Sequence, residues 1–451
     1  MKRDDPGGDS MTHPKQSFQL DIPEKWNLIP LRYVVNGIES GNRDASFEPT
    51  PEDSGVLSIG GGHFDDKGEW QLESPRYIST AMYEDMQQGK ITNGDTLLVK
   101  DGATIGKAAY VNSIPAGQAA VNSHVYVLKP SSRLHDRLLT YNLWSSWCQS
   151  QIKSLTRGSA QAGLPSSFSG EVLIPVPPTD DQIEIVEFLD ESMQHIDALI
   201  EKKNELMELL DEKRQVIIHR AVTTGLDGNH SLVSTELPWP NQIPSSWSLK
   251  PLRAVVDRRN EMNSPVKETR ILSVVREKGV IRYEDRGASG NKATDDLEKY
   301  QIVQDGDIVA NRLNLLIGSS GIAHERGICS PEYIVLNPNE EEIHPKYISY
   351  IFVDNSFLKW LARHGKGIQD LRERVYYKDL RSEQIPVPPR KEQEEIVNRL
   401  EQELEHIDAL TDSLSSSIDL LSQKREALIT NAVTGQLAID EREPDINVST
   451  S

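Results

Sequence analysis

The segment Ile174-Pro175-Val176-Pro177-Pro178 opens a stretch that occurs twice in this 451-residue chain. It returns 211 residues later as Ile385-Pro386-Val387-Pro388-Pro389. The same shift, without a gap, carries His195-Ile196-Asp197-Ala198-Leu199 onto His406-Ile407-Asp408-Ala409-Leu410. Identity of this extent is not expected by chance, so the chain contains an internal repeat, and its fold must be understood as a doubled unit.

Each copy of the repeat predicts one long helix. The two prolines are followed by acidic residues, such as Asp181 in the first copy and Glu392 in the second, and carboxylates in the first turn stabilise a helix N-terminus. Apolar residues then recur at three- and four-residue spacing over about five heptads, as in a coiled-coil seam. Gly225 and Gly435, just after Val-Thr, are plausible stops.

The predicted seam is the surface through which the two helices meet a partner. Leu199, Leu206 and Leu209 widen the first stripe, which predicts that this helix meets more than one partner. The least costly partner for one helix is the other, packed antiparallel within the molecule; a homodimer of parallel helices is the alternative. As seam and subunit-docking residues the pattern selects Val186, Leu189, Ile196, Leu210, Val397, Leu400, Ile407 and Leu421.

Two arginines occupy the same seam position in the two copies. Arg214 and Arg425 are related by the shift of 211 and are polar where the pattern calls for an apolar residue. Either each side chain extends out of the seam into solvent, or each fixes the register or binds a carboxylate on a partner helix.

Composition bounds the class of protein. No run of 18 apolar residues is present, so no membrane span is expected, and the polar segment 1–16 lacks the apolar core of a signal peptide. The two cysteines, Cys148 and Cys329, are far apart and have no ligand-like neighbours. A reduced, cytoplasmic protein is the expectation.

The net charge of −20 argues at first against nucleic acid, but its distribution matters more. Most of the net negative charge lies on the two repeat segments and their flanks, whereas the blocks between them are close to neutral and contain basic stretches at 100–157 and 346–381. Such stretches are either surfaces that bind the phosphates of a nucleic acid or ordinary solvent-exposed faces.

Each predicted helix follows a globular block that opens in the same way. Ile22-Pro23-Glu24-Lys25-Trp26 returns 221 residues later as Ile243-Pro244-Ser245-Ser246-Trp247. Because this shift differs from 211, insertions lie inside the blocks, which share a fold but differ in their loops. The blocks hold strand-like runs, including 95–99, 125–128, 306–310 and 333–336, and a short amphipathic helix each, at 138–155 and 345–363.

The fold class predicted is therefore α/β (α+β), with an antiparallel-rich sheet in each of two similar globular domains and two long antiparallel coiled-coil helices related by a pseudo-two-fold repeat. The predicted division is a disordered tail (1–21), a first domain (22–173), a first helical spacer (174–226), a linker (227–242), a second domain (243–384), a second helical spacer (385–437) and a second disordered tail (438–451).

No constellation of residues rises to an active site. The segment 101–108 resembles a phosphate loop only faintly, because the glycine spacing is one residue short and Ala108 replaces the metal-binding hydroxyl. Gly60-Gly61-Gly62 lacks the spacing and the following helix of a dinucleotide loop. The histidines show no metal-ligand spacing, and the serines have no nucleophile-elbow context.

What remains is a pair of donor-rich loops, each placed just before a long helix. Arginine and glutamine side chains recognise the edges of guanine and adenine through two hydrogen bonds each, so these loops are candidates for contact with bases. The plainer interpretation is that each loop is a tight turn that closes its domain. The candidate DNA-binding residues are Arg157, Ser159 and Gln161 in the first loop and Lys366, Gln369 and Arg372 in the second, together with Lys100 and Lys107 outside the loops.

The doubled order of Ile-Pro-Val-Pro-Pro, a glutamine, His-Ile-Asp-Ala-Leu, Lys-Arg and Ala-Val-Thr resembles the specificity subunit of type I restriction–modification systems over residues 22–437. The resemblance implies two target recognition domains that each read half of a split DNA sequence. It also implies antiparallel spacers that set the gap and dock two modification (methyltransferase) subunits, with restriction (helicase–nuclease) subunits joining them.

On this basis the chain itself carries no catalytic residue, cofactor or metal, and S-adenosylmethionine, ATP and Mg²⁺ are expected on the partner subunits. The half-sites are expected to differ because the blocks differ, and to lie near one helical turn of DNA, about 10 bp, or a multiple apart. A non-catalytic coiled-coil scaffold with two protein-binding domains is the alternative, and a stand-alone nuclease is the weakest reading.

Overall fold

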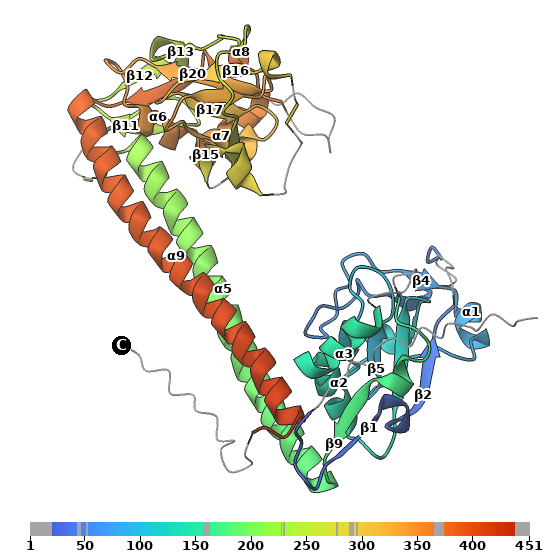
Figure 1. Ribbon diagram of the computed structural model, residues 1–451. Helices are drawn as coiled ribbons and strands as arrows, with labels where there is room; N and C mark the ends of the chain where they lie inside the picture. Colours follow the sequence, from blue (N-terminus) through green and yellow to red (C-terminus); the bar gives the residue numbers. More distant parts are fainter. Residues whose placement is uncertain are drawn as a thin grey trace, which may run out of the picture. The chain divides into compact units, whose positions relative to one another are not determined.

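The computed structural model describes residues 20–42, 47–50, 53–156, 163–226, 228, 231–276, 278–287, 293–294, 296–364 and 374–437. The chain divides into two compact units, one made of Met1–Lys202 with Ser417–Ser451 and the other of Lys203–Ser416. Each unit therefore contains one globular domain together with part of each long helix (Figure 1). The tails predicted at 1–21 and 438–451 lie outside the described residues, apart from residues 20 and 21.

The two long helices lie where the repeat predicts them. Helix α5 spans Thr179–Thr223 and helix α9 spans Arg390–Val433, 45 and 44 residues respectively, so each is about 65 Å long at ~1.5 Å per residue. Gly225 and Gly435 follow their ends with φ of 77° and 72°, the left-handed conformation that glycine adopts without strain. The predicted stops are confirmed.

Within each unit the two helices run antiparallel. In the first unit Ile200 packs in one core with Leu421, while Val186, nearer the start of α5, shares that core with Val433 at the end of α9. In the second unit Val222 lies in one core with Val397 near the start of α9. The intramolecular pairing is confirmed, and all eight predicted seam residues pack into the core of their own unit.

Both seam arginines bind a carboxylate on the other helix. Arg425 Nε lies 3.7 Å from Asp197 Oδ1 in the first unit, and Arg214 pairs with Asp408 in the second. The shift of 211 converts one pair into the other. The Arg425 side chain is only 16% exposed and its guanidinium lies 5.3 Å from the Trp144 ring centroid. The register-fixing role of these arginines is therefore the reading that the structure supports.

The first domain is a mixed α/β structure. Its main sheet has the antiparallel order β2-β8-β5-β6, a second sheet has the order β4-β3-β7, and β1 pairs with β9. Its elements are β1 (Asn27–Pro30), β2 (Val35–Ser40), β3 (Val56–Ile59), β4 (Tyr77–Ile78), α1 (Thr80–Asp85), β5 (Thr96–Val99), β6 (Ala108–Tyr110), β7 (Ala119–Val121), β8 (Val125–Pro130), α2 (Asp136–Trp144), α3 (Ser146–Thr156), α4 (Phe168–Glu171) and β9 (Leu173–Val176).

The second domain repeats the main sheet as β13-β20-β17-β18 and repeats the β1–β9 pair as β12–β21. Its elements are β10 (Leu232–Ser234), β11 (Gln242–Pro244), β12 (Ser248–Pro251), β13 (Val256–Arg258), β14 (Leu272–Val275), β15 (Gly279–Arg282), β16 (Gln301–Val303), β17 (Ile308–Asn311), β18 (Ser320–Ile322), β19 (Gly327–Cys329), β20 (Tyr333–Pro338), α6 (Pro345–Ile351), α7 (Asn355–Leu361), α8 (Tyr377–Leu380) and β21 (Gln384–Val387).

The prediction of a single short helix before each loop is wrong, because two helices occupy each of these segments. Ser145 takes extended backbone angles between α2 and α3, and its hydroxyl accepts a hydrogen bond from Cys148 N. Asp354 caps α7 by accepting from Ser356 N and Phe357 N. Short polar side chains that satisfy the first amides of a new helix favour such a break.

The segment predicted as a linker, 227–242, contributes ordered structure to the second unit. Strand β10 pairs with β11, and Trp239 is buried against Phe357 with a ring-centroid separation of 4.6 Å. Its indole N–H donates to Asp354 Oδ2 at 2.8 Å.

Two repeated contacts attach each domain to its own long helix. Gln182 Oε1 accepts from His135 N at 2.7 Å and its amide donates to Pro177 O; Gln393 does the same with His344 N and Pro388 O. The Trp26 indole donates to Asp181 and the Trp247 indole to Glu392, which the shift of 211 relates to Asp181. The repeated sequence phrase therefore encodes a repeated junction.

We expect Arg425→Ala to lower the free energy of unfolding by about 1–3 kcal/mol, because it removes a partly buried ion pair and the stacking on Trp144. Lys391→Ala is the matched control on the same helix, where the ion pair with Glu395 is exposed and local; a loss below about 0.5 kcal/mol is expected. Urea denaturation measures both. Equal losses in the two variants would show that the seam arginine does not fix the pairing.

A second prediction concerns His219 of α5, whose Nδ1 lies 3.2 Å from both carboxylate oxygens of Asp354. The hydrogen bond with Asp354, whose side chain is 1% exposed, raises the pKa of His219 against the opposing effect of burial. The protonated pair therefore stabilises the second unit fully below about pH 6.5, and this contribution is lost as the pH rises through the raised pKa.

The stability difference between the wild-type chain and His219→Ala should accordingly be largest near pH 6 and shrink toward about pH 9. Urea titrations at several pH values, followed by tryptophan fluorescence, measure it. Gln194→Ala, at an exposed position of the same helix that carries no titratable group, is the control and should show no such trend. A difference that is independent of pH would contradict the ion pair.

Candidate nucleic-acid interface

Six of the eight candidate DNA-binding residues, Arg157, Ser159, Gln161, Lys366, Gln369 and Arg372, lie outside the described residues. Lys100 and Lys107 are described, and both come from the region around β5 and β6 of the first domain. The two loops predicted to read bases therefore stay predictions, and the interface is built here from the residues that flank them.

Lys100 and Arg312 occupy equivalent positions in the two domains. Each directly follows the central strand of the main sheet, β5 or β17. Lys100 O accepts from Leu164 N at 2.6 Å and Arg312 O accepts from Val375 N at 3.1 Å, and the two donors are 211 residues apart. Both cations thus lie beside the point where the chain returns from the predicted reading loop.

Both cations also lie near an aromatic ring. Lys100 Nζ is 4.9 Å from the Tyr126 ring centroid, and the Arg312 guanidinium is 5.6 Å from that of Tyr376. Lys100 Nζ donates to the Ser40 hydroxyl at 3.0 Å, whereas Arg312 forms an ion pair with Glu332. The sequence analysis missed Arg312; aligning the strand at 95–99 with the strand at 307–311 would have revealed it.

The second domain has a hollow of about 250 Å³ beside Arg312. The Arg258 guanidinium lies 5.7 Å from the Tyr377 ring centroid and Lys378 Nζ lies 5.7 Å from that of Tyr376. Neither Arg258 nor Lys378 forms an ion pair with a residue that the structure describes. Cations held beside aromatic rings suit both the phosphates and the bases of a nucleic acid. The hollow is lined by Arg258, Arg312, Tyr333, Ile334, Tyr376, Tyr377 and Lys378.

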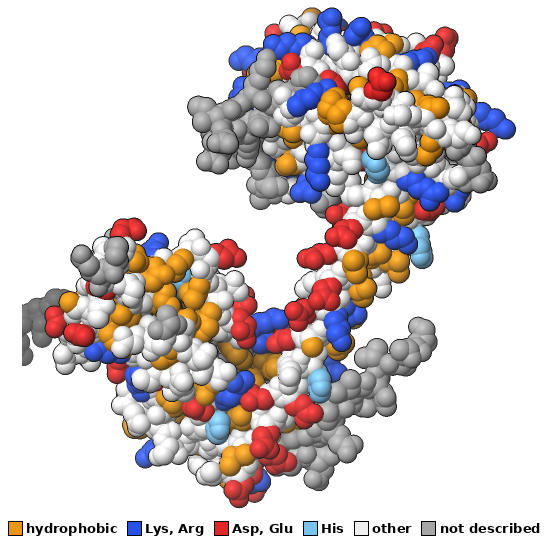
Figure 2. Space-filling view, turned by 180° about the vertical axis from the view of Figure 1, so that it is seen from behind, with side chains coloured by type: hydrophobic (Ala, Val, Ile, Leu, Met, Phe, Trp, Pro, Cys, Tyr) orange, Lys and Arg blue, Asp and Glu red, His pale blue; other side chains and the backbone are white. Residues whose placement is uncertain are grey.

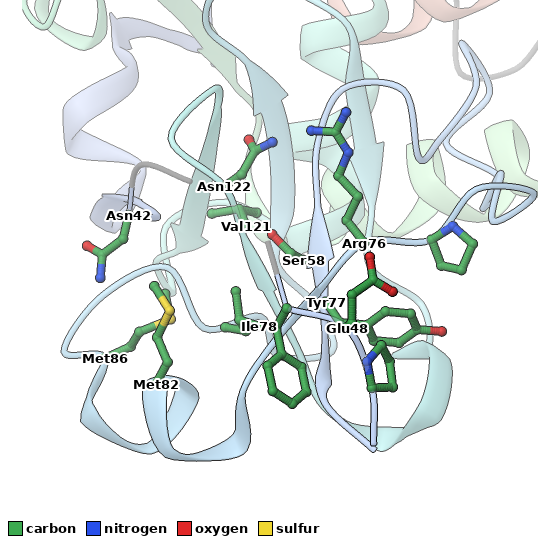
Figure 3. A pocket seen from close by; sticks show the side chains of 13 residues that line it. Asn42, Glu48, Ser58, Arg76, Tyr77, Ile78, Met82, Met86, Val121 and Asn122 are labelled. Atoms are coloured by element: carbon green, nitrogen blue, oxygen red, sulfur yellow. The ribbon is translucent and has the colours of Figure 1, made fainter. Parts of the chain in front are cut away.

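The first domain has two adjoining hollows, of about 560 Å³ and about 900 Å³, and Arg76 and Asn122 line both. In the smaller hollow, Figure 3 shows Arg76 and Asn122 on the same edge, away from the apolar side formed by Met82 and Met86. The carboxamide oxygen of Asn122 accepts from His124 N at 2.9 Å, so its amide group remains as a hydrogen-bond donor on this edge. The edge between the hollows therefore presents hydrogen-bond donors.

Lys107 is turned toward its own domain. Its Nζ donates to Phe64 O at 2.5 Å and lies 5.1 Å from the Phe64 ring centroid. The amine thus holds the 60–71 loop, which forms one wall of the 900 Å³ hollow. Direct contact of Lys107 with DNA stays a prediction.

The sites considered unlikely from sequence behave as turns or packed side chains. Gly102 and Gly106 adopt φ of 92° and 90°, as in a turn, and Gly60 N donates to the His63 ring within a tight loop. Burial raises the pKa of the Cys148 thiol to about 12 and also raises that of Cys329. Across the described ranges no group of three or more His, Cys, Asp or Glu side chains is arranged to hold a metal ion.

The long helices differ from the domains in surface character. Figure 2 shows acidic side chains along the visible face of these helices, interspersed with Lys and Arg. Six of the eight predicted seam residues are buried within the chain, and Leu210 and Leu421 pack against its cores and are partly buried, so little of the seam is left for a partner subunit. Among the helices of the described part, none has an apolar stretch sufficient to cross a membrane.

Comparison with known proteins finds relatives that are similar to this chain in sequence and a solved structure that is similar in fold. The EcoKI specificity subunit of Escherichia coli K12 is 23% identical over 408 residues, covering 82% of this chain and 85% of that protein. The StySPI specificity subunit of Salmonella potsdam is 21% identical, covering 94% and 92%. A solved structure described as the basis of complex assembly and conformational transition of the type I R-M system matches with a TM-score of 0.66 at 18% identity, covering 93% and 100%.

The family model described as the type I restriction modification DNA specificity domain matches residues 23–209 and again 246–419. Each match takes in one globular domain and a large part of the long helix that follows it. With two copies of this domain over most of its length, the chain belongs to the type I restriction modification DNA specificity domain family.

Proposed function

We propose that this chain is the DNA specificity subunit of a type I restriction–modification complex, in which it reads an asymmetric, bipartite target and docks the other subunits without performing chemistry itself. One observation carries the proposal. A DNA specificity domain occurs twice, on helices whose contacts repeat, while the residues on the candidate reading surfaces do not.

The difference between the two reading surfaces supports an asymmetric target. At the equivalent position the first domain has Lys100, which bonds to a neutral hydroxyl, and the second has Arg312, which is paired with Glu332. A lysine amine and a paired guanidinium present different donor patterns to a base edge. We therefore assign one half-site to each domain, with different bases in the two.

Exposed leucines on the helices support docking of two equivalent partners. Leu209 on α5 is 59% exposed and Leu420 on α9 is 65% exposed, and the shift of 211 relates them. Leu206 and Val216 extend the apolar row around Leu209. The row itself is not repeated, because Ser417 and Ala427 stand at the positions equivalent to Leu206 and Val216. Exposed apolar side chains mark protein interfaces, and a leucine exposed at the same position of both helices fits two copies of the same partner. We assign these positions to two modification subunits.

Restriction subunits would join that assembly, and S-adenosylmethionine, ATP and Mg²⁺ are assigned to the partner subunits by resemblance to the family. The exposed leucines also fit a second candidate function, a scaffold that carries two protein-binding domains. Isolation of the complex from the native host separates the two: methyltransferase subunits support the specificity role, and unrelated partners support the scaffold.

Mapping of methylated adenines in the host genome tests the proposed function directly. We expect a bipartite motif that disappears when this chain is deleted. Replacement of residues 24–170 by the corresponding block of another family member should change one half-site and leave the other half-site and the gap unchanged. If no motif depends on this chain, or if both half-sites change together, the assignment of one half-site per domain is wrong.

We expect Arg258→Ala and Lys378→Ala each to weaken DNA binding about equally for all sequences and to reduce the slope of log K against log salt by about 1, because each cation would release one counterion. Fluorescence anisotropy of the complex with its modification subunits measures this at several salt concentrations. Lys299→Ala, which breaks the exposed pair with Asp296 on the same domain, is the control and should leave the slope unchanged. An unchanged slope in the two test variants would place the DNA elsewhere.

A further inference from the structure

A rigid loop in the first domain reaches from the candidate reading surface to the long helices. Phe64 and Trp70 form a bridge across the base of the loop. At its tip, Asp65 Oδ1 accepts hydrogen bonds from Lys67 N and Glu69 N, both at 2.9 Å. These bonds fix the backbone at Lys67, so the direction of its side chain is set by the loop.

Close packing holds the loop against its own domain. Gly68 has φ of 84°, and a Cβ atom there would lie 3.1 Å from Ala109 Cα and 3.3 Å from the Trp144 ring. Only glycine allows this approach at such a φ. This packing and the hydrogen bond from Lys107 Nζ to Phe64 O hold the loop in a fixed position against β6 and α2.

The tip of the loop ends on the paired helices. Lys67 Nζ lies 2.8 Å from Asp197 Oδ1 of α5, and Arg425 Nε of α9 lies 3.7 Å from the same oxygen. Arg425 is in turn stacked on Trp144, against which the loop packs. One carboxylate therefore receives a cation from the domain and a cation from the other helix.

The same loop forms part of the candidate reading surface. Residues 60–66 line the 900 Å³ hollow. Asp66, adjacent to Lys67, also lines a hollow of about 310 Å³ together with Arg425. A shift of the loop on the helices would therefore move a wall of the surface that is proposed to meet DNA.

We propose that Lys67 is a positioning residue, which holds the reading surface of the first domain at a fixed place on the helix pair and so makes recognition sensitive to the gap between the half-sites. This inference rests on the proposed function and deepens it. The helices α5 and α9 continue into the second unit, so a domain that is free to shift on them would accept a wider range of gaps.

The experiment compares the wild-type chain with Lys67→Met, Lys67→Arg and Lys25→Met, each assembled with its modification subunits. Lys25 is the matched control because it also pairs with α5, at 3.0 Å from Asp181, but at the junction where the chain already joins domain and helix. The probes are duplexes that carry the methylated motif of the host with its native gap or with one base pair added or removed. Anisotropy gives the ratio of affinities for native and altered gaps.

Lys67→Met should reduce the preference for the native gap by about threefold to fivefold, because a partly exposed ion pair between domain and helix is lost. Lys67→Arg should restore the preference, and Lys25→Met should leave it unchanged. An unchanged preference in Lys67→Met overturns the inference. An equal loss of affinity for all duplexes with a smaller salt slope also overturns it, because Lys67 would then contact phosphate. Absence of any bipartite preference in the wild-type complex refutes the proposed function itself.

Discussion

The pairing of a seam arginine with an aspartate on the opposite helix is the constraint on which the rest of the structure depends. A seam of leucine, isoleucine and valine drives two helices together but tolerates slippage by a turn, since one apolar layer resembles the next. A guanidinium in the seam removes that freedom, because only one register places it beside a carboxylate. Arg214 with Asp408 and Arg425 with Asp197 supply this restriction once in each unit, and each arginine is 17 residues away from the aspartate of its own helix.

Once the register is fixed, the junctions at Gln182 and Gln393 determine how each domain joins its helix. A buried carboxamide that accepts one amide and donates to carbonyls makes bonds that no apolar side chain replaces, and unmade bonds of this kind are costly. The domain cores vary between the two halves, whereas these junction residues do not. The repeat therefore keeps the junctions constant while the interiors of the two domains differ.

The sequence allowed prediction of what depends on periodicity and repetition. The long helices, their glycine stops, the antiparallel pairing and the central strands were all predicted, because each leaves a regular pattern along the chain. The break at Ser145 and the ordered segment around Trp239 were not. Both arise from single side chains that bond to groups distant in sequence or to the first amides of a short helix, and neither leaves a period to detect.

The candidate interface was less accessible to prediction for a related reason. Arg76 and Asn122 are 46 residues apart and meet only because β3 pairs with both β4 and β7. Arg312 becomes conspicuous only when its strand is superimposed on that of Lys100. Surfaces of this kind are built from the ends of strands, where neighbouring chains converge, so their residues are scattered in sequence even when the scaffold is strictly repeated. The repeat therefore reveals the frame that holds the two candidate reading surfaces, and under the proposed function the differences at equivalent strand ends would let each surface read its own bases.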